Sequence, residues 1–190
     1  MYNIAVFVSG RGSNLKAILN TIPNSIKIAA VISDKLDCAA FDIADQYKIT
    51  KYSVLDKFKS GYLRYEELLK IFLNLEIDLI VLAGFLKKIP DIIIDQYVGS
   101  IINIHPALLP SFGGKGMYGM NVHKAVVENK EIESGITIHF VNEKYDDGEL
   151  IFQATCPVVE SDTPEMVAQK IHELEFKHFP AVIEKVLQSS

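Results

Sequence analysis

Residues 3–14 read NIAVFVSGRGSN, and this stretch decides the fold class. Its apolar run, residues 3–9, is rich in β-branched and aromatic side chains, which is typical of a strand buried on both faces of a parallel sheet. A glycine-containing turn follows, and Leu15, Ile18 and Leu19 then recur at helical spacing. Strand, glycine turn and helix together favour anion binding, because free N–H groups and the positive end of the helix dipole face the turn.

The same turn also has a purely structural interpretation, in which Ser13 caps the following helix. Its pattern, GxGSN, lacks the lysine of a Walker loop and the third glycine of the dinucleotide-binding fingerprint. The residues of this turn alone leave both interpretations open.

Downstream of this unit, apolar runs alternate with helical patterns, as in a doubly wound, mostly parallel α/β sheet of the Rossmann-like kind. Further strands are predicted at residues 26–33, 48–53, 77–84 and from 101, and helices at 39–47, 64–75, 90–97 and 122–129. Residues 135–142 and 150–155 predict a C-terminal antiparallel hairpin around a YDDG turn. Residues 161–165 predict the start of a long final helix, with Pro164 at its first position, that runs to Leu187 with a break near Pro180.

Composition excludes several classes of function. The 190 residues carry a net charge of −5, fit one domain spanning residues 1–190, and lack the clustered basic residues that nucleic-acid binding needs. No apolar run is long enough for a membrane span, and the N-terminal run is predicted to be a strand and not a leader, so we expect a cytoplasmic protein. Cys38 and Cys156 are far apart and predict neither a disulfide nor a zinc site.

The segment IINIHPALLPS, residues 101–111, carries the clearest chemical signal. Asn103 and His105 are two positions apart on a predicted strand, so their side chains point to the same face. Pro106 and Pro110 then end regular structure. A carboxamide beside an imidazole at a strand end can stabilise a carbonyl oxygen as it becomes an oxyanion.

Other polar groups follow predicted strand ends. Lys87 and Lys88 come after the most hydrophobic strand, at the edge where open α/β sheets bind ligands, although lysines on an exposed loop are an alternative. Residues 112–120, FGGKGMYGM, can fold over a ligand or serve as a mobile connection. His123 is predicted to be a surface or packing residue, and His139 a hydrogen-bonded structural histidine within a strand.

Asp146 and Asp147 lie in the hairpin turn, and we hypothesise that this turn, the glycine turn and the Asn103/His105 pair converge at one edge. A carboxylate reaching His105 would raise the pKa of the imidazole and keep it protonated. Ser9 and Ser111 are not in a nucleophile elbow, and the histidines lack metal-binding spacing, so neither a covalent nucleophile nor a metal is predicted. Direct attack by a substrate amine on an acyl group fits these residues best.

The segments SGRGSNLKAIL, VLAGFLKKIP, INIHPALLPS and GITIHFVNEKYDDG together resemble the phosphoribosylglycinamide formyltransferase family, folate-dependent enzymes of purine synthesis. The resemblance covers essentially the whole chain. It implies formyl transfer from the cosubstrate 10-formyltetrahydrofolate to the amine of a small phosphoribosylglycinamide substrate, without a metal. It also implies a protein with no nucleic-acid or membrane partner, acting as a monomer or homodimer.

Carried over position by position, the resemblance implies three groups of site residues. The catalytic residues would be Asn103, His105 and Asp146, with Asp146 and not Asp147 at the position of the family's aspartate. The phosphoribosylglycinamide site would comprise Gly12, Ser13, Asn14 and Glu175, and the folate site Leu86, Lys87, Lys88, Ile89, Asn103 and Val141. The sequence departs from the family at Arg64, which is displaced by about two positions on our alignment, and at Asn121, so neither receives a role.

Three alternatives share some of these features. A methionyl-transfer-RNA formyltransferase would need an additional RNA-binding domain, and a formyltetrahydrofolate hydrolase would need a regulatory segment before the first strand, which here begins at residue 3. A nucleotide-binding regulatory module is a rival from another class. It would not need Asn103, His105 and Asp146 together, so the formyltransferase remains the preferred interpretation.

Overall fold

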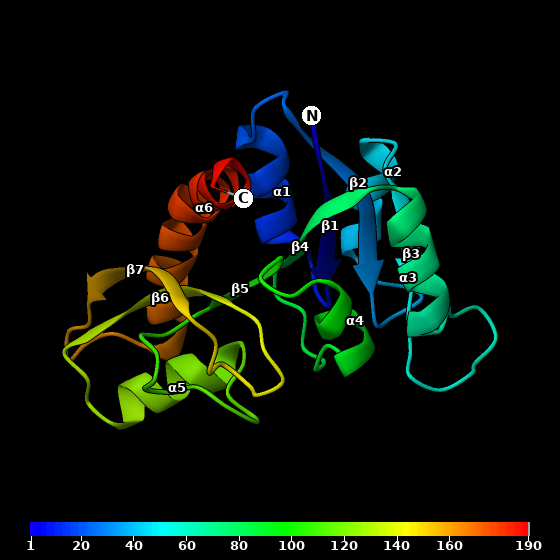
Figure 1. The fold of residues 1–190 in the computed structure, drawn as a ribbon. Helices are drawn as coiled ribbons and strands as arrows, with labels where there is room; N and C mark the ends of the chain where they lie inside the picture. Colours follow the sequence, from blue (N-terminus) through cyan, green and yellow to red (C-terminus); the bar gives the residue numbers. More distant parts are fainter. Residues whose placement is uncertain (190) are drawn as a thin grey trace.

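The computed structural model describes residues 1–189, which form a seven-stranded sheet flanked by helices (Figure 1). The strands are β1 (Tyr2–Val8), β2 (Ile26–Ser33), β3 (Thr50–Ser53), β4 (Ile77–Leu82), β5 (Ile101–His105), β6 (Glu133–Phe140) and β7 (Leu150–Pro157). The helices are α1 (Ser13–Thr21), α2 (Ala40–Gln46), α3 (Tyr65–Asn74), α4 (Asp91–Gln96), α5 (Met120–Glu128) and α6 (Pro164–Gln188).

The strand order is β3-β2-β1-β4-β5-β6-β7, in which β1 to β5 pair in parallel and β6 and β7 are antiparallel. The predicted fold class is therefore confirmed, including the C-terminal hairpin and the central position of β4. The strand order reverses between β1 and β4. From β1 the chain adds β2 and then β3 on one side, and it then returns to add β4 and β5 on the other side. At such a point the loops after the strands diverge and open a crevice for a ligand.

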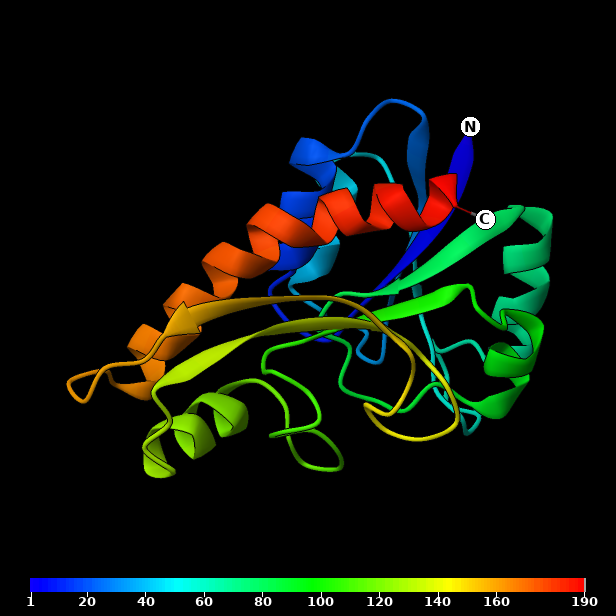
Figure 2. The ribbon, with the colours of Figure 1, turned by 60° about the vertical axis from the view of Figure 1, so that its left-hand side comes forward.

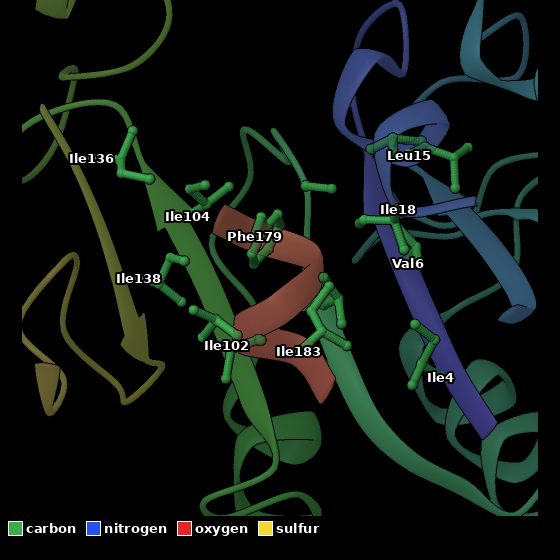
Figure 3. Close-up of a cluster of buried hydrophobic side chains, with 14 of the residues drawn as sticks. Ile4, Val6, Leu15, Ile18, Ile102, Ile104, Ile136, Ile138, Phe179 and Ile183 are labelled. Carbon is green, nitrogen blue, oxygen red and sulfur yellow. The ribbon is translucent and has the colours of Figure 1, made fainter. Parts of the chain in front are cut away.

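The sheet separates two apolar layers, and alternate residues of β1 face each of them. Ile4, Val6 and Val8 pack with residues of α1, α2 and α6, whereas Ala5 and Phe7 pack with residues of α3 and α4. Figure 3 shows part of the first layer, with isoleucines of β5 and β6 together with side chains of α6. Burial on both faces explains why the N-terminal run is continuously apolar.

The glycine turn after β1 follows the anion-binding pattern in its backbone. α1 begins at Ser13, and Gly12 precedes it in a left-handed conformation with φ of +78°. A Cβ on Gly12 would lie 2.7 Å from the Cβ of Ala40, so only glycine fits there. The interpretation of Ser13 as the helix cap is wrong, because Gly12 holds the cap position and no side chain caps the helix.

The final helix, α6, corrects another expectation. It runs unbroken from Pro164 to Gln188 with Pro180 inside it, whereas the sequence predicts a break near that residue. Buried side chains on both sides of Pro180, including Phe179 and Ile183, pack into one core layer and hold the two halves in line. Figure 2 shows the helix lying along the sheet. No helix among residues 1–189 is long and apolar enough to cross a membrane.

Candidate active site

A cavity of about 530 Å³ opens at the carboxyl ends of β1, β4 and β5. Its wall includes Asn103 and His105 of β5, His139 of β6, Asp146 of the hairpin turn and Glu175 of α6. The side chains therefore come from four elements that are far apart in the sequence. Their meeting point is the edge at which doubly wound sheets bind ligands.

Antiparallel pairing between β5 and β6 positions the two polar residues of β5. Asn103 lies opposite His139, and His105 lies opposite Thr137. Cross-strand partners of this kind point to the same face of the sheet. The Nδ2 atom of Asn103 donates to Nε2 of His139 across 3.2 Å, so the carboxamide is held by its strand partner.

His105 is buried, with 3% of its surface exposed. Its Nε2 donates to the carbonyl oxygen of Phe112 at 2.8 Å. Its Nδ1 lies 3.6 Å from Oδ2 of Asp146. Since a carbonyl can only accept, the proton of a neutral His105 is on Nε2 and Nδ1 is left facing the carboxylate.

Asp146 is the aspartate of the turn that faces this cluster. It has a positive φ of 52°, and its Oδ2 accepts a hydrogen bond from the backbone N–H of Gly114 at 2.8 Å. Asp147 instead points to the exterior, where its carboxylate lies 3.5 Å from Nζ of Lys144. The two neighbouring aspartates are thus separated by backbone conformation, and only Asp146 lines the cavity.

The surroundings of Asp146 favour its charged form, whereas those of His105 favour its neutral form. Burial alone would raise the pKa of Asp146, but the neighbouring His139 and His105 and the Gly114 N–H together lower it below its usual value. Burial also lowers the pKa of His105, and this effect outweighs the opposing attraction of Asp146. The expectation that a carboxylate would keep His105 protonated is therefore wrong for the protein without substrate.

Two residues that the sequence patterns do not single out hold the loop after β5. Thr137 Oγ1 donates to the carbonyl of Ala107 at 2.7 Å and accepts from the backbone N–H of Leu109 at 3.0 Å. Gln153 of β7 donates to both the Leu109 carbonyl and Thr137 Oγ1. These contacts fix the loop that follows His105, and only the hairpin register brings them together.

His139 combines two features. As predicted, it is buried and hydrogen-bonded, because its Nδ1 donates to the carbonyl of Phe140 at 2.7 Å. It also contacts Asn103, and its Nε2 lies 3.7 Å from Oδ1 of Asp146. The signal that could have identified it is its register, since a strand paired with the one carrying Asn103 must present some residue opposite it.

A second polar group lies where α1 meets α6. Glu175 is buried, with 5% of its surface exposed, and its Oε2 accepts from Nδ2 of Asn14 at 3.1 Å and from Nδ1 of His172 at 2.9 Å. The contact with Glu175 raises the pKa of His172. Oδ1 of Asn14 is buried and has no hydrogen-bond partner among residues 1–189.

The glycine turn reaches the cavity only in part. Ser9 and Gly10 line its wall, whereas Gly12, Ser13 and Asn14 are joined to it through the bond from Asn14 to Glu175. The turn is therefore continuous with the cavity along one side.

The residues expected to bind folate form another stretch of the wall, which includes Leu86, Lys87, Lys88, Ile89, Asn103 and Val141. Ile89 is buried, whereas Leu86 is 45% exposed at the opening. The Leu86 N–H donates to Oγ of Ser9 at 2.9 Å, which ties this loop to the end of β1. Apolar area and lysines lie side by side here, as a ligand with an aromatic body and an anionic end requires.

The structure also locates residues to which the sequence assigns no role. Arg64 precedes α3 and pairs with Glu67, outside the cavity. Asn121 donates to the carbonyl of Gly116 within the glycine-rich segment 112–120, part of which lines the cavity. His123 is buried in α5, as a packing residue would be, but its Nδ1 lacks a hydrogen-bond partner within the described part of the chain, residues 1–189. Among residues 1–189 no group of three or more His, Cys, Asp or Glu side chains is arranged to hold a metal ion.

Comparison with known proteins identifies the class to which this fold and site belong. Residues 2–183 match the formyl transferase family, so the protein is a formyl transferase. A phosphoribosylglycinamide formyltransferase of Haemophilus influenzae is 36% identical over 96% of this chain and 86% of its own length. The chain therefore belongs to the phosphoribosylglycinamide formyltransferase family of enzymes.

Two further proteins show the extent of the similarity. A chloroplastic phosphoribosylglycinamide formyltransferase of Arabidopsis thaliana is 38% identical over 95% of this chain, which spans 63% of that protein's length. The crystal structure of the enzyme of the same name from Anaplasma phagocytophilum superposes with a TM-score of 0.88 at 32% identity. That match covers 99% of this chain and 88% of the other.

Proposed function

We propose that the protein transfers a formyl group from 10-formyltetrahydrofolate to the glycinamide amine of N1-(5-phosphoribosyl)glycinamide in de novo purine biosynthesis. One observation carries the proposal. Asn103, His105 and Asp146 meet in one cavity, with the buried Glu175 on one side and the lysine-bearing apolar wall on another. Two substrates can therefore reach the same point from different sides.

The phosphoribosyl substrate is assigned to the side formed by α1 and α6. Gly12, Ser13 and Asn14 stand at the start of α1, where helix N–H groups and the helix dipole favour a phosphate. Glu175 would accept hydrogen bonds from ribose hydroxyls. Its burial and the hydrogen bond that it accepts from Asn14 support this role, because together they hold the carboxylate at the junction of the turn and the cavity.

The folate cosubstrate is assigned to the wall formed by Leu86, Lys87, Lys88, Ile89 and Val141, together with Asn103. The apolar side chains would cover the pterin ring, and the lysines would attract the carboxylates of the folate tail. Asn103 belongs to both the folate group and the catalytic group because it lies where this wall meets the cluster.

Formyl transfer would then proceed by direct attack. The lone pair of the glycinamide amine forms a bond to the formyl carbon, and the carbonyl electrons move to the oxygen. Asn103 donates a hydrogen bond to this oxyanion, an interaction typically worth about a hundredfold to a thousandfold in rate. The intermediate collapses by breaking the bond to the folate nitrogen, which takes up the proton that the amine loses. No metal is used in this sequence.

His105 and Asp146 would carry that proton. Because burial lowers the pKa of His105, its imidazole starts neutral and can accept a proton at Nδ1, directly or through water. Asp146 stays ionised, and its Oδ2 is 3.6 Å from Nδ1, so the carboxylate stabilises the imidazolium once it forms. The imidazolium then stabilises the oxyanion and returns the proton to the leaving nitrogen.

The proposal is tested with purified protein and 10-formyltetrahydrofolate, with and without the ribonucleotide, by following loss of the formyl group. We expect turnover only when both substrates are present, and no loss of activity in EDTA. Turnover without the ribonucleotide would overturn the transferase in favour of a hydrolase. Strong inhibition by EDTA would contradict the metal-free reaction.

A further inference from the structure

We propose that His139 is a positioning residue that fixes which end of the Asn103 carboxamide faces the substrate. The proposal deepens the function above and rests on it, since the oxyanion must be bound by an N–H of Asn103. It concerns a residue that touches neither substrate in the proposed reaction. The argument starts from the hydrogen bonds of the imidazole.

The Nδ1 atom of His139 must carry a proton. Its partner at 2.7 Å is the carbonyl oxygen of Phe140, which can only accept a hydrogen bond. In a neutral imidazole the other nitrogen, Nε2, is then a bare acceptor. His139 is 2% exposed, so its ring is shielded from bulk solvent.

Nε2 of His139 in turn selects one orientation of Asn103. A bare nitrogen attracts the NH2 end of a carboxamide and repels its oxygen, and Nδ2 of Asn103 is the atom found 3.2 Å away. Nδ2 carries two hydrogens, so one binds His139 and the other is left for the cavity that Asn103 lines. Without this partner the carboxamide could rotate and present its oxygen, which would repel a developing oxyanion.

The backbone around His139 is shaped to keep this arrangement. The pairing of β6 with β7 is irregular between Ile138 and His139, and such irregularities redirect side chains near active sites. Gly148 approaches the Phe140 carbonyl so closely that an added Cβ would lie 1.7 Å from its oxygen. The glycine of the YDDG turn therefore lets that carbonyl sit where it can accept from Nδ1 of His139.

Asp146 offers His139 a competing contact. Its Oδ1 lies 3.7 Å from Nε2, which is an ion-pair distance and longer than a hydrogen bond. A proton on Nε2 would instead face this carboxylate, which is the arrangement in which His139 lowers the pKa of Asp146, and it would repel the NH2 group of Asn103. The tautomer of His139 is thus the feature that decides the orientation of Asn103, and it can be measured directly.

The first experiment is nitrogen NMR of the wild-type protein, with the His139 signals assigned by their loss in His139→Gln. Long-range proton–nitrogen correlations should show a protonated Nδ1 and a bare, hydrogen-bonded Nε2 at neutral pH. A proton on Nε2 would overturn the proposal. This measurement needs no substrate, so it can contradict the role of His139 whether or not the protein transfers a formyl group.

The second experiment compares His139→Gln with His139→Phe in that assay. Gln can place an acceptor oxygen near the position of Nε2, whereas Phe fills the space without an acceptor. We expect Phe to lower kcat by about tenfold to a hundredfold with both KM values within about threefold, and Gln to recover most of the loss. Equal losses in the two variants would overturn the proposal, provided that both melt cooperatively.

A double variant separates orientation from general disruption. If His139 acts through Asn103, adding His139→Phe to Asn103→Ala should cost less than about threefold more, although each change alone is costly. Losses that multiply would mean that His139 acts independently. His178→Gln serves as the matched control, because that histidine contacts the ring of Phe152 outside the cavity and should retain full activity.

Discussion

The parallel and antiparallel halves of the sheet contribute to the site in different ways. In the parallel half, β1 and β4 are covered by helices on both faces, so polar groups are available only where the strands end, at Ser9 and in the loop that begins at Gly84. The antiparallel half, which comprises β6, β7 and the edge of β5 that pairs with β6, presents Asn103, His105, Thr137 and His139 from within the strands. The first half supplies ligand-binding turns, and the second supplies side chains at fixed cross-strand spacing.

This difference assigns distinct tasks to the two halves. In the proposed function, the groups at the strand ends and at the α1–α6 junction would contact parts of the substrates that do not react, so changes there should alter substrate binding. The side chains of the antiparallel half would surround the reacting carbonyl, so changes there should alter turnover. The following predictions test that division.

The largest effect among the three predictions that follow is expected at Asp146, in the turn of the antiparallel hairpin. Asp146→Asn removes the charge that stabilises protonated His105, and we expect kcat to fall by about a hundredfold with little change in either KM. Asp147→Asn should stay within about twofold of wild type, because Asp147 is exposed beside Lys144. Initial-rate kinetics of the two variants measure this contrast. Similar losses in both would show that the two aspartates are not separated as the structure has them.

A smaller effect, of a different kind, is expected at Glu175. Glu175→Gln keeps the shape of the side chain but removes its charge, and we expect the KM for the ribonucleotide to rise about tenfold while the KM for folate is unchanged. Since Glu175 raises the pKa of His172, the same variant should lower that pKa, which NMR can follow. Glu184→Gln, on the same helix, is the control because Glu184 accepts a hydrogen bond from Gln188 at 3.0 Å and lies outside the cavity. A fall in kcat with the KM for the ribonucleotide unchanged would contradict the assignment of Glu175 to substrate binding.

The sequence predicts the local parts of this site well, for physical reasons. The apolar, β-branched run before Gly10 is typical of a strand covered on both faces, and the two-residue spacing of Asn103 and His105 places them on one side of a strand whatever its neighbours are. Both inferences depend on residues that are adjacent in the chain. The confirmed fold class follows from the same local patterns.

The remaining features depend on contacts that sequence periodicity does not encode. Glu175 has the surroundings of an exposed helix residue in the sequence, and it is buried only because α6 packs on α1 beside Asn14. The ionisation of His105 depends on how completely it is buried, which outweighs the carboxylate. Likewise, α6 passes through Pro180 because side chains on both sides of it share one core layer.

The smallest effect on activity is expected at His123, which lies in α5 over the antiparallel half and should affect stability instead. Burial, together with the nearby His172, lowers the pKa of His123 from 6.5 to about 4, although Glu175 acts in the opposite direction. The unfolded chain therefore binds a proton on this residue at a pH where the folded protein does not. That difference stabilises the folded state fully above pH 6.5 and is lost progressively as the pH falls toward 4.

For His123 alone, the linkage amounts to about 2 kcal/mol less stability at pH 5 than at pH 7.5. His123→Gln removes the titrating group, so the dependence of its unfolding free energy on pH should be flatter than that of wild type by about this amount. Denaturant unfolding at the two pH values measures the difference. His178→Gln is the matched control: burial and Lys177 also lower the pKa of His178, but it is less buried than His123, so the slope should flatten less than in His123→Gln. If His123→Gln keeps the full slope, the acid sensitivity of the fold must come from other groups, and the stability of the antiparallel half would not depend on a neutral His123.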